Sequence, residues 1–117
     1  MTGTKIDATD ADFATAVLEA SKERPVVVDF WATWCAPCRA LGPILEKVAQ
    51  ERGGAFLLAK VDTDANPMVA GQLGVQSIPT VVAFRDGRPV DGFVGALPEA
   101  QVNAFRSEEH TSELQSH

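Results

Sequence analysis

The chain has 117 residues, 45% of them hydrophobic, and carries 10 basic against 16 acidic side chains, a net charge of −6. This length supports one domain with a hydrophobic core and leaves no room for a second. The acidic balance argues against a nucleic-acid partner, because phosphate contacts require concentrated Lys and Arg. No apolar stretch approaches the roughly 20 residues of a membrane span, and acidic residues interrupt the N-terminal segment where a signal peptide is apolar. We therefore expect a cytoplasmic protein that makes no membrane contact.

Hydrophobic periodicity predicts helices and strands that follow one another along the chain. In order, we expect a helix at 9–21, a strand at 26–31, a helix at 35–52, a strand at 56–62, a helix at 67–73, strands at 80–84 and 90–94, and a helix from residue 98. The apolar, β-branched run at 26–31 is typical of a central strand covered on both faces, and 26–62 is predicted to form a βαβ unit. Asp86-Gly87 indicates the turn of an antiparallel hairpin. The pattern predicts an α/β fold with a central mixed sheet flanked by helices.

Several residues are candidates for the ends of these helices. Thr9 or Asp10 can cap the first helix, and Asn66, with Pro67 after it, can cap the third. Pro43 lies inside the second helix, where the loss of one backbone hydrogen bond predicts a kink.

The two cysteines, Cys35 and Cys38, are three residues apart where a strand gives way to a helix. Three interpretations are open. Zinc requires four Cys or His ligands, but both histidines lie in the polar C-terminal segment. A purely bracing disulfide at this spacing closes too short a loop to constrain the unfolded chain much. Redox chemistry is favoured, because residues three apart on a helix are close enough to form and break a disulfide.

The two thiols are expected to differ in environment. Cys35 lies at the helix N-terminus, where free N–H groups and the helix dipole lower the pKa of its thiol and make it the candidate nucleophile. Cys38 lies inside the first turn and should be more shielded, as a resolving thiol. We expect no metal and no external cofactor, since the redox group is the Cys35–Cys38 pair itself.

Asp29 lies in the middle of an otherwise apolar strand. A buried carboxylate is costly unless it is paired or has a function. Placed beneath the helix that carries the cysteines, it could accept the proton of Cys38, with Lys60 on the neighbouring strand as its charge partner. The alternative is an aspartate whose side chain reaches solvent at the edge of the strand.

Three further positions have both a plain and a functional interpretation. Pro79, after Ile78, is either the entry of a strand or a cis proline whose loop exposes backbone groups to a substrate chain. Trp34, directly before the first cysteine, is expected to be partly exposed beside the site. Gly95 is most simply a turn residue between a strand and a helix.

With these residues assembled, the chain closely resembles the thioredoxin family over residues 5–105. The matching segments are VDFWATWCAPCR at 28–39, Pro43, KVD at 60–62, Gly74-Val75, SIPT at 77–80, Asp86-Gly87 and VGAL at 94–97. The resemblance implies a thioredoxin fold and a thiol-disulfide oxidoreductase that reduces disulfide bonds of client proteins. Ala36 departs from the pattern, because the most typical members have glycine there.

The resemblance also implies roles for individual residues. Cys35 is the nucleophile, Cys38 the resolving thiol, and Asp29 a buried proton acceptor near Lys60. The implied substrate-docking residues are Trp34, Ala36, Pro37, Ile78, the cis proline Pro79 and Gly95. The implied electron donor is an NADPH-dependent thioredoxin reductase.

A narrower resemblance, over VDGFVGALPE at 90–99, is to bacterial co-chaperones that join a thioredoxin domain to tetratricopeptide repeats. It implies an alternative function as the thioredoxin domain of a client-holding co-chaperone, working with a chaperone system, whose helical repeats are missing from this chain.

Residues 106–117 lack the preceding periodicity. The string RSEEHTSELQSH resembles the conceptual translation of a sequencing adapter. We therefore expect a thioredoxin domain at 1–105, a non-native polar tail that is disordered from about residue 107, and a natural protein that continues beyond 105.

Overall fold

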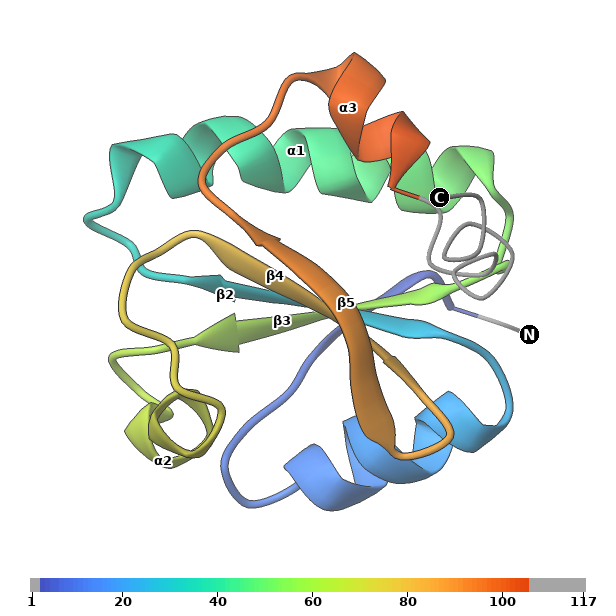
Figure 1. Ribbon diagram of the computed structural model, residues 1–117, viewed down its shortest axis with the longest axis vertical. Helices are drawn as coiled ribbons and strands as arrows, with labels where there is room; N and C mark the ends of the chain where they lie inside the picture. The colour runs from blue at the N-terminus through green and yellow to red at the C-terminus, as the bar shows by residue number, and fades with distance from the viewer. Residues whose placement is uncertain (1–2, 106–117) are drawn as a thin grey trace.

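The computed structural model describes residues 3–105, which form a five-stranded sheet with helices on both faces (Figure 1). The elements are β1 (Lys5–Asp7), the π-helix η1 (Ala14–Glu19), the 3-10 helix η2 (Ala20–Lys22), β2 (Val26–Trp31), α1 (Ala36–Glu51), β3 (Leu57–Asp62), α2 (Pro67–Gln72), β4 (Thr80–Arg85), β5 (Arg88–Val94) and α3 (Glu99–Ala104). The strand order is β1-β3-β2-β4-β5. β3 pairs in parallel with β1 and β2, whereas β4 pairs antiparallel with β2 and β5. The predicted mixed sheet, with its βαβ unit and hairpin, is confirmed.

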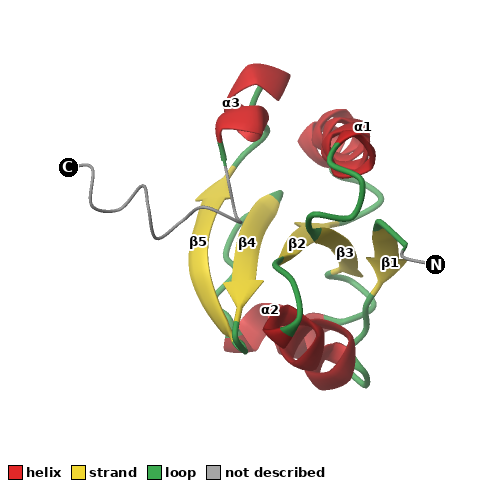
Figure 2. Ribbon diagram, turned by 90° about the vertical axis from the view of Figure 1, so that its right-hand side faces the viewer, coloured by secondary structure: helices red, strands yellow, loops and turns green. Residues whose placement is uncertain are grey.

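Two hydrophobic layers cover the sheet, and side chains of the central strand β2 alternate between them. Val26, Val28 and Phe30 pack against η1 and α2, whereas Val27 points to the opposite face, beneath α1 and α3. Figure 2 shows α1 and α3 on one side of the sheet and α2 on the other. By the same alternation Asp29 faces α1, so the fold directs this carboxylate toward the helix that begins at the cysteines.

The first helical segment differs from its prediction in extent and in type. It begins after Phe13 rather than at residue 9, and it is a π-helix followed by a 3-10 turn. Thr9 and Asp12 exchange hydrogen bonds in the preceding turn: the Asp12 amide donates to Thr9 Oγ1, and the Thr9 amide donates to Asp12 Oδ1. Phe13 and Val17 of this segment are buried in the core.

Asn66 precedes α2 as the predicted N-cap residue and Pro67 begins the helix, but the hydrogen bonds at this helix start come from another residue. Asn66 occupies the N-cap position, but its side chain makes no capping hydrogen bond. The carboxylate of Asp10 instead accepts the free amides of Met68 and Val69, at 3.2 and 2.8 Å. Asn66 Oδ1 accepts the Asp10 amide in return, at 2.9 Å. A long-range contact has thus taken Asp10 away from the first helix, because an anion is stabilised at the unsatisfied N–H groups of another.

The short edge strand β1 has no counterpart in the predicted elements. Its three residues pair in parallel with β3, and Lys5 is aligned with Leu58. A three-residue strand with only Ile6 as a large apolar residue has no detectable periodicity, so only pairing with β3 defines it.

The turn between β4 and β5 has the predicted chemistry. Asp86 and Gly87 both have positive φ, 56° and 83°, as a two-residue turn of type I′ requires. The turn is anchored from below by Ser21, whose hydroxyl oxygen accepts the Gly87 amide at 2.8 Å. Among the helices of residues 3–105, none is long and apolar enough to cross a membrane.

Candidate active site

Cys35 and Cys38 form a disulfide at the N-terminus of α1, with their Cα atoms 5.3 Å apart. Cys35 is the N-cap residue, in an extended conformation, and its sulfur accepts the backbone amide of Cys38 at 3.2 Å. Ala36 and Pro37 occupy the first helical positions, where the missing amide of proline costs no hydrogen bond. An N–H group of the helix terminus is therefore aimed at the sulfur predicted to be the nucleophile.

The expected difference in shielding between the two cysteines is not found. Cys35 is 3% exposed and Cys38 is 4% exposed. Both pack with Ala32 against Trp31 and Ile78. In the disulfide-bonded state, burial therefore does not distinguish the two cysteines.

Asp29 is buried, which rules out the interpretation in which its side chain reaches solvent at the edge of the strand. It is 1% exposed, and its Oδ2 lies 3.8 Å from Lys60 Nζ. Burial raises the pKa of Asp29 to about 6, with Lys60 opposing and Glu46 adding to the rise. Its other oxygen, Oδ1, has no hydrogen-bond partner within residues 3–105. The carboxyl group thus has a pKa close to that of a neutral-pH base.

Lys60 has a second partner that the sequence interpretation missed. Its ammonium group donates a hydrogen bond to Glu46 Oε2 at 3.2 Å, closer than its contact with Asp29. A Cβ added at Gly42 would lie 3.2 Å from this ammonium. Cys38, Gly42 and Glu46 are spaced by four residues, so they share one face of α1. That spacing was the available signal for Glu46, which stands two turns after the second cysteine on the same face.

The loop before β4 meets the end of β5 beside the disulfide. The Ile78–Pro79 peptide bond is cis, as one of the two interpretations expected. Gly95, with φ of 95°, donates its amide to the carbonyl oxygen of Pro79 at 2.8 Å. Ile78 packs against the two cysteines, so this contact brings Gly95 to the same corner of the molecule.

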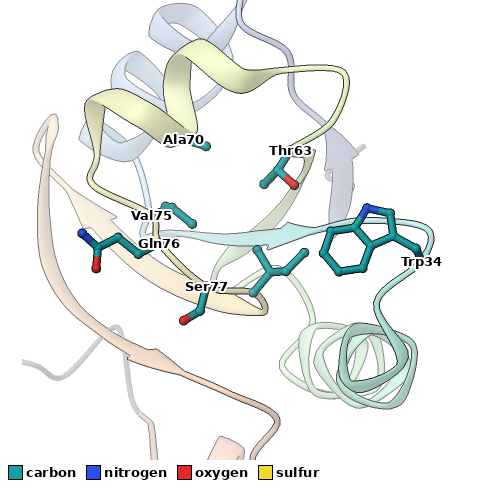
Figure 3. Close-up of a pocket in the computed structure, with 7 residues that line it drawn as sticks. Trp34, Thr63, Ala70, Val75, Gln76 and Ser77 are labelled. Carbon is teal, nitrogen blue, oxygen red and sulfur yellow. The ribbon is translucent and has the colours of Figure 1, made fainter.

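A cavity of about 420 Å³ opens next to this corner (Figure 3). It is lined by Trp34, Thr63, Ala70, Val75, Gln76, Ser77 and Ile78. Trp34 is 66% exposed, and its indole N–H donates to Asp64 Oδ2 at 2.9 Å. The hydrogen bond fixes one edge of the ring while the rest stays open to a partner. Only Trp34 and Ile78 of these lining residues were predicted site residues. Three of the others directly precede Ile78 in the same loop, whereas Ala70 lies in α2 and Thr63 follows β3.

The predicted site residues therefore form two groups. Trp34, the cysteines, Ile78, Pro79 and Gly95 lie around the disulfide, with Ala36 and Pro37 exposed at the start of α1. Asp29 and Lys60 lie beneath α1, and Asp29 makes no hydrogen bond to either cysteine. Within residues 3–105, no group of three or more His, Cys, Asp and Glu side chains is arranged to hold a metal ion.

Comparison with known proteins agrees with this geometry. A thioredoxin family model matches residues 4–108. A thioredoxin of Chlorobaculum thiosulfatiphilum is 44% identical over 108 residues, which span 92% of this chain and 97% of that protein. A thioredoxin of Mycobacterium tuberculosis is 52% identical over 95 residues, 81% of this chain and 80% of that protein. The chain belongs to the thioredoxin family.

As a thioredoxin, the protein is a disulfide oxidoreductase of the protein-disulfide-reductase type, and the Cys35–Cys38 disulfide fits its redox site. A bifunctional thioredoxin reductase/thioredoxin of Mycobacterium leprae is 47% identical over 98 residues, 84% of this chain and 21% of that protein. The narrower resemblance to tetratricopeptide co-chaperones finds no support in these relatives and stays a prediction. The expected non-native, disordered tail lies outside the described residues.

Proposed function

We propose that this thioredoxin reduces protein disulfides by two successive thiol-disulfide exchanges through its Cys-Ala-Pro-Cys site. The Cys35 thiolate attacks one sulfur of the substrate disulfide, which forms a mixed disulfide and releases the first substrate thiolate. The Cys38 thiolate then attacks Cys35, which releases the second substrate thiolate and leaves the Cys35–Cys38 disulfide. Two electrons pass from the dithiol to the substrate. The observation that carries the proposal is the disulfide at the start of α1, with the Cys38 amide directed at the Cys35 sulfur.

Asp29 is the proposed acceptor of the Cys38 proton in the second step, with Lys60 near it. A pKa of about 6 supports this role, because most of the carboxyl group is then ionised at neutral pH but still binds a proton more readily than an exposed aspartate. The sheet face on which Asp29 lies supports it too, since that face is covered by α1. The rate of this step should therefore rise as the pH passes through about 6.

The cavity beside the disulfide is the proposed docking site for the substrate chain. Trp34 and Ile78 line it, and Pro79, the residue after Ile78, accepts the Gly95 amide. Exposed Ala36 and Pro37 extend the surface at the start of α1. Apolar side chains next to free backbone groups are expected to bind an extended segment of a client protein that contains a disulfide bond.

The proposed electron donor is an NADPH-dependent thioredoxin reductase, and the fused reductase of the Mycobacterium leprae relative supports this choice. Net reduction of disulfides belongs to a reducing compartment, so a cytoplasmic location is part of the proposal. A bacterial reductase mixed with the full chain should oxidise NADPH when a disulfide substrate is present. No oxidation with any such reductase would remove the donor from the proposal but leave the exchange chemistry intact.

The decisive experiment is reduction of insulin by the full chain and its cysteine variants. The wild type should accelerate reduction by dithiothreitol, and Cys35→Ser should fall to the uncatalysed rate. Cys38→Ser should accumulate a mixed disulfide on Cys35, visible by mass spectrometry without reductant. Circular dichroism of each variant controls for folding.

Activity that survives Cys35→Ser would overturn the proposed exchange. Capture of an unfolded client by the double variant, with both cysteines replaced by serine, would favour the holding activity of the co-chaperone alternative.

A further inference from the structure

The ammonium group of Lys60 lies between two carboxylates and is closer to the one outside the proposed exchange mechanism. Its Nζ is 3.2 Å from Glu46 Oε2, within hydrogen-bond distance, and 3.8 Å from Asp29 Oδ2. The side chains of Lys60 and Asp29 are 15% and 2% exposed, against 34% for Glu46. Among the described residues, Lys60 is the only cation in contact with the Asp29 carboxylate, and this contact is longer than the one between Lys60 and Glu46.

The position of Lys60 is supported by two neighbouring residues. Its Nζ lies 5.4 Å from the centre of the Trp31 ring, as a cation–π contact. It also lies next to Gly42, where an added Cβ would be 3.2 Å away. Glycine at this point of α1 leaves space for the ammonium group next to the helix, within reach of Glu46 one turn further on.

We propose that Glu46 is a positioning residue that draws the Lys60 ammonium away from Asp29 and so keeps this carboxylate basic enough to take a proton at neutral pH. The inference rests on the proposed function of Asp29 as proton acceptor. Glu46 acts in two ways with the same sign: it competes for the cation, and its own negative charge opposes ionisation of Asp29.

The charged groups near Asp29 determine how its pKa should change when one of them is substituted. β3 contributes Lys60, and α1 contributes Glu46 and the Cys38 end of the same helix face. β4 contributes the uncharged register partner Val81. Lys5 of β1 lies 3.6 Å from Glu46 Oε2 and partly neutralises it. Because the Lys5 side chain is 48% exposed, solvent screens its charge, and the effect of Lys5 on Asp29 should be smaller than that of Glu46.

The test is the titration of the Asp29 carboxyl carbon by NMR in the oxidised full chain, in which no cysteine titrates. The signal is assigned by its absence in Asp29→Asn. Glu46→Gln removes the charge but keeps an oxygen that can accept the Lys60 hydrogen bond. It should lower the pKa of Asp29 by about half a pH unit. Lys5→Gln should raise that pKa by a smaller amount. Glu51→Gln is the matched control, on the same helix but paired with Lys47 at 4.0 Å, and should leave it unchanged.

An unchanged or higher Asp29 pKa in Glu46→Gln would overturn the inference, as would an equal fall in Glu51→Gln. The second readout is the pH profile for resolution of a mixed disulfide by the reduced protein, which should move to lower pH in Glu46→Gln. If the NMR titration moves as expected but Asp29→Asn retains the wild-type pH profile, the positioning role stands and the proposed proton-acceptor role of Asp29 fails.

Discussion

Asp29 and Lys60 are register partners on the parallel strands β2 and β3, with Asp29 Oδ2 3.8 Å from Lys60 Nζ. This distance exceeds that of a direct hydrogen bond, and Asp29 Oδ1 has no hydrogen-bond partner in the described part of the chain. The buried carboxylate is therefore only partly compensated for the hydration that it loses on folding. Burial accordingly raises its pKa, and the contact with Lys60 does not restore the ordinary value.

This raised pKa predicts how stability depends on pH. The pKa of Asp29 rises from 3.8 to about 6 on folding, so the native state binds the proton more tightly than the unfolded chain does. The free energy of unfolding should therefore fall as the pH rises from about 4 to about 6 and remain lower above that range. Asp29→Asn should remove the loss and stabilise the oxidised protein by up to about 3 kcal/mol at pH 8, at about 1.36 kcal/mol per pH unit.

Urea unfolding of the wild type and Asp29→Asn at pH 4 and pH 8 measures this difference. The two proteins should be nearly equal at the lower pH. Asp86→Asn is the control, since Asp86 is exposed in a turn that also accepts asparagine. A variant at Asp29 that is less stable than the wild type at pH 8 would contradict the prediction.

Substitution of Trp34 should weaken substrate binding without changing the disulfide chemistry. Its ring borders the cavity and is mostly exposed, so Trp34→Ala should remove contact area for the substrate chain without changing the disulfide. Truncation of an exposed aromatic anchor costs about 1–2 kcal/mol, which corresponds to a rise in KM for a protein disulfide of roughly 5- to 30-fold.

The control at this position is Trp34→Phe, which keeps an aromatic ring but loses the hydrogen bond to Asp64. It should fall between the wild type and the alanine variant in steady-state insulin reduction. Equal KM values for the alanine variant and the wild type would show that the cavity does not bind this substrate.

The close approach of β5 to β4 at Gly92 leaves no room for a larger side chain at this position. A Cβ at this position would lie 2.7 Å from the carbonyl oxygen of Val81, closer than real contacts allow, and the neighbouring atom belongs to the backbone. Gly92→Ala should therefore push β5 away from β4 and destabilise the protein by about 1–3 kcal/mol. Thermal unfolding should show the loss.

Gly71 in α2 is the matched control, because no atom lies within 4 Å of a Cβ added there. Gly71→Ala should stabilise by about 0.5–1 kcal/mol through helix propensity. The same sign of change in both variants would mean that the close approach to Val81 is not what requires glycine at position 92.

The buried hydroxyl group of Ser21 is expected to contribute measurably to stability. It is fully buried, donates to the Leu18 carbonyl at 2.7 Å and accepts the Gly87 amide at 2.8 Å. Ser21→Ala leaves that turn amide without its acceptor and should cost about 1–3 kcal/mol. Chemical denaturation should measure this loss, whereas Ser77→Ala, at an exposed serine, should stay within about 0.5 kcal/mol of the wild type.

Local patterns were sufficient for much of this molecule. The apolar run at 26–31 and the spacing of the cysteines depend on residues that are neighbours along the chain. Strand β2 and the start of α1 therefore appear in the structure where the sequence predicted them. The Asp86-Gly87 turn was predictable for the same reason, since two adjacent residues meet its backbone requirement.

The sequence by itself determined the chemistry of the protein: a two-cysteine redox site where a strand meets a helix, with an acidic residue in the strand before it. Only the tertiary structure decided which charges surround Asp29. The packing of α1 across β2 and β3 sets the distances from the Lys60 ammonium group to Asp29 and to Glu46. The tertiary structure also decided that Asp10 caps α2 rather than the first helix, and that β1 exists at all. The physical reason is one and the same: distances between residues remote in sequence are set by the packing of layers, and no local periodicity encodes them.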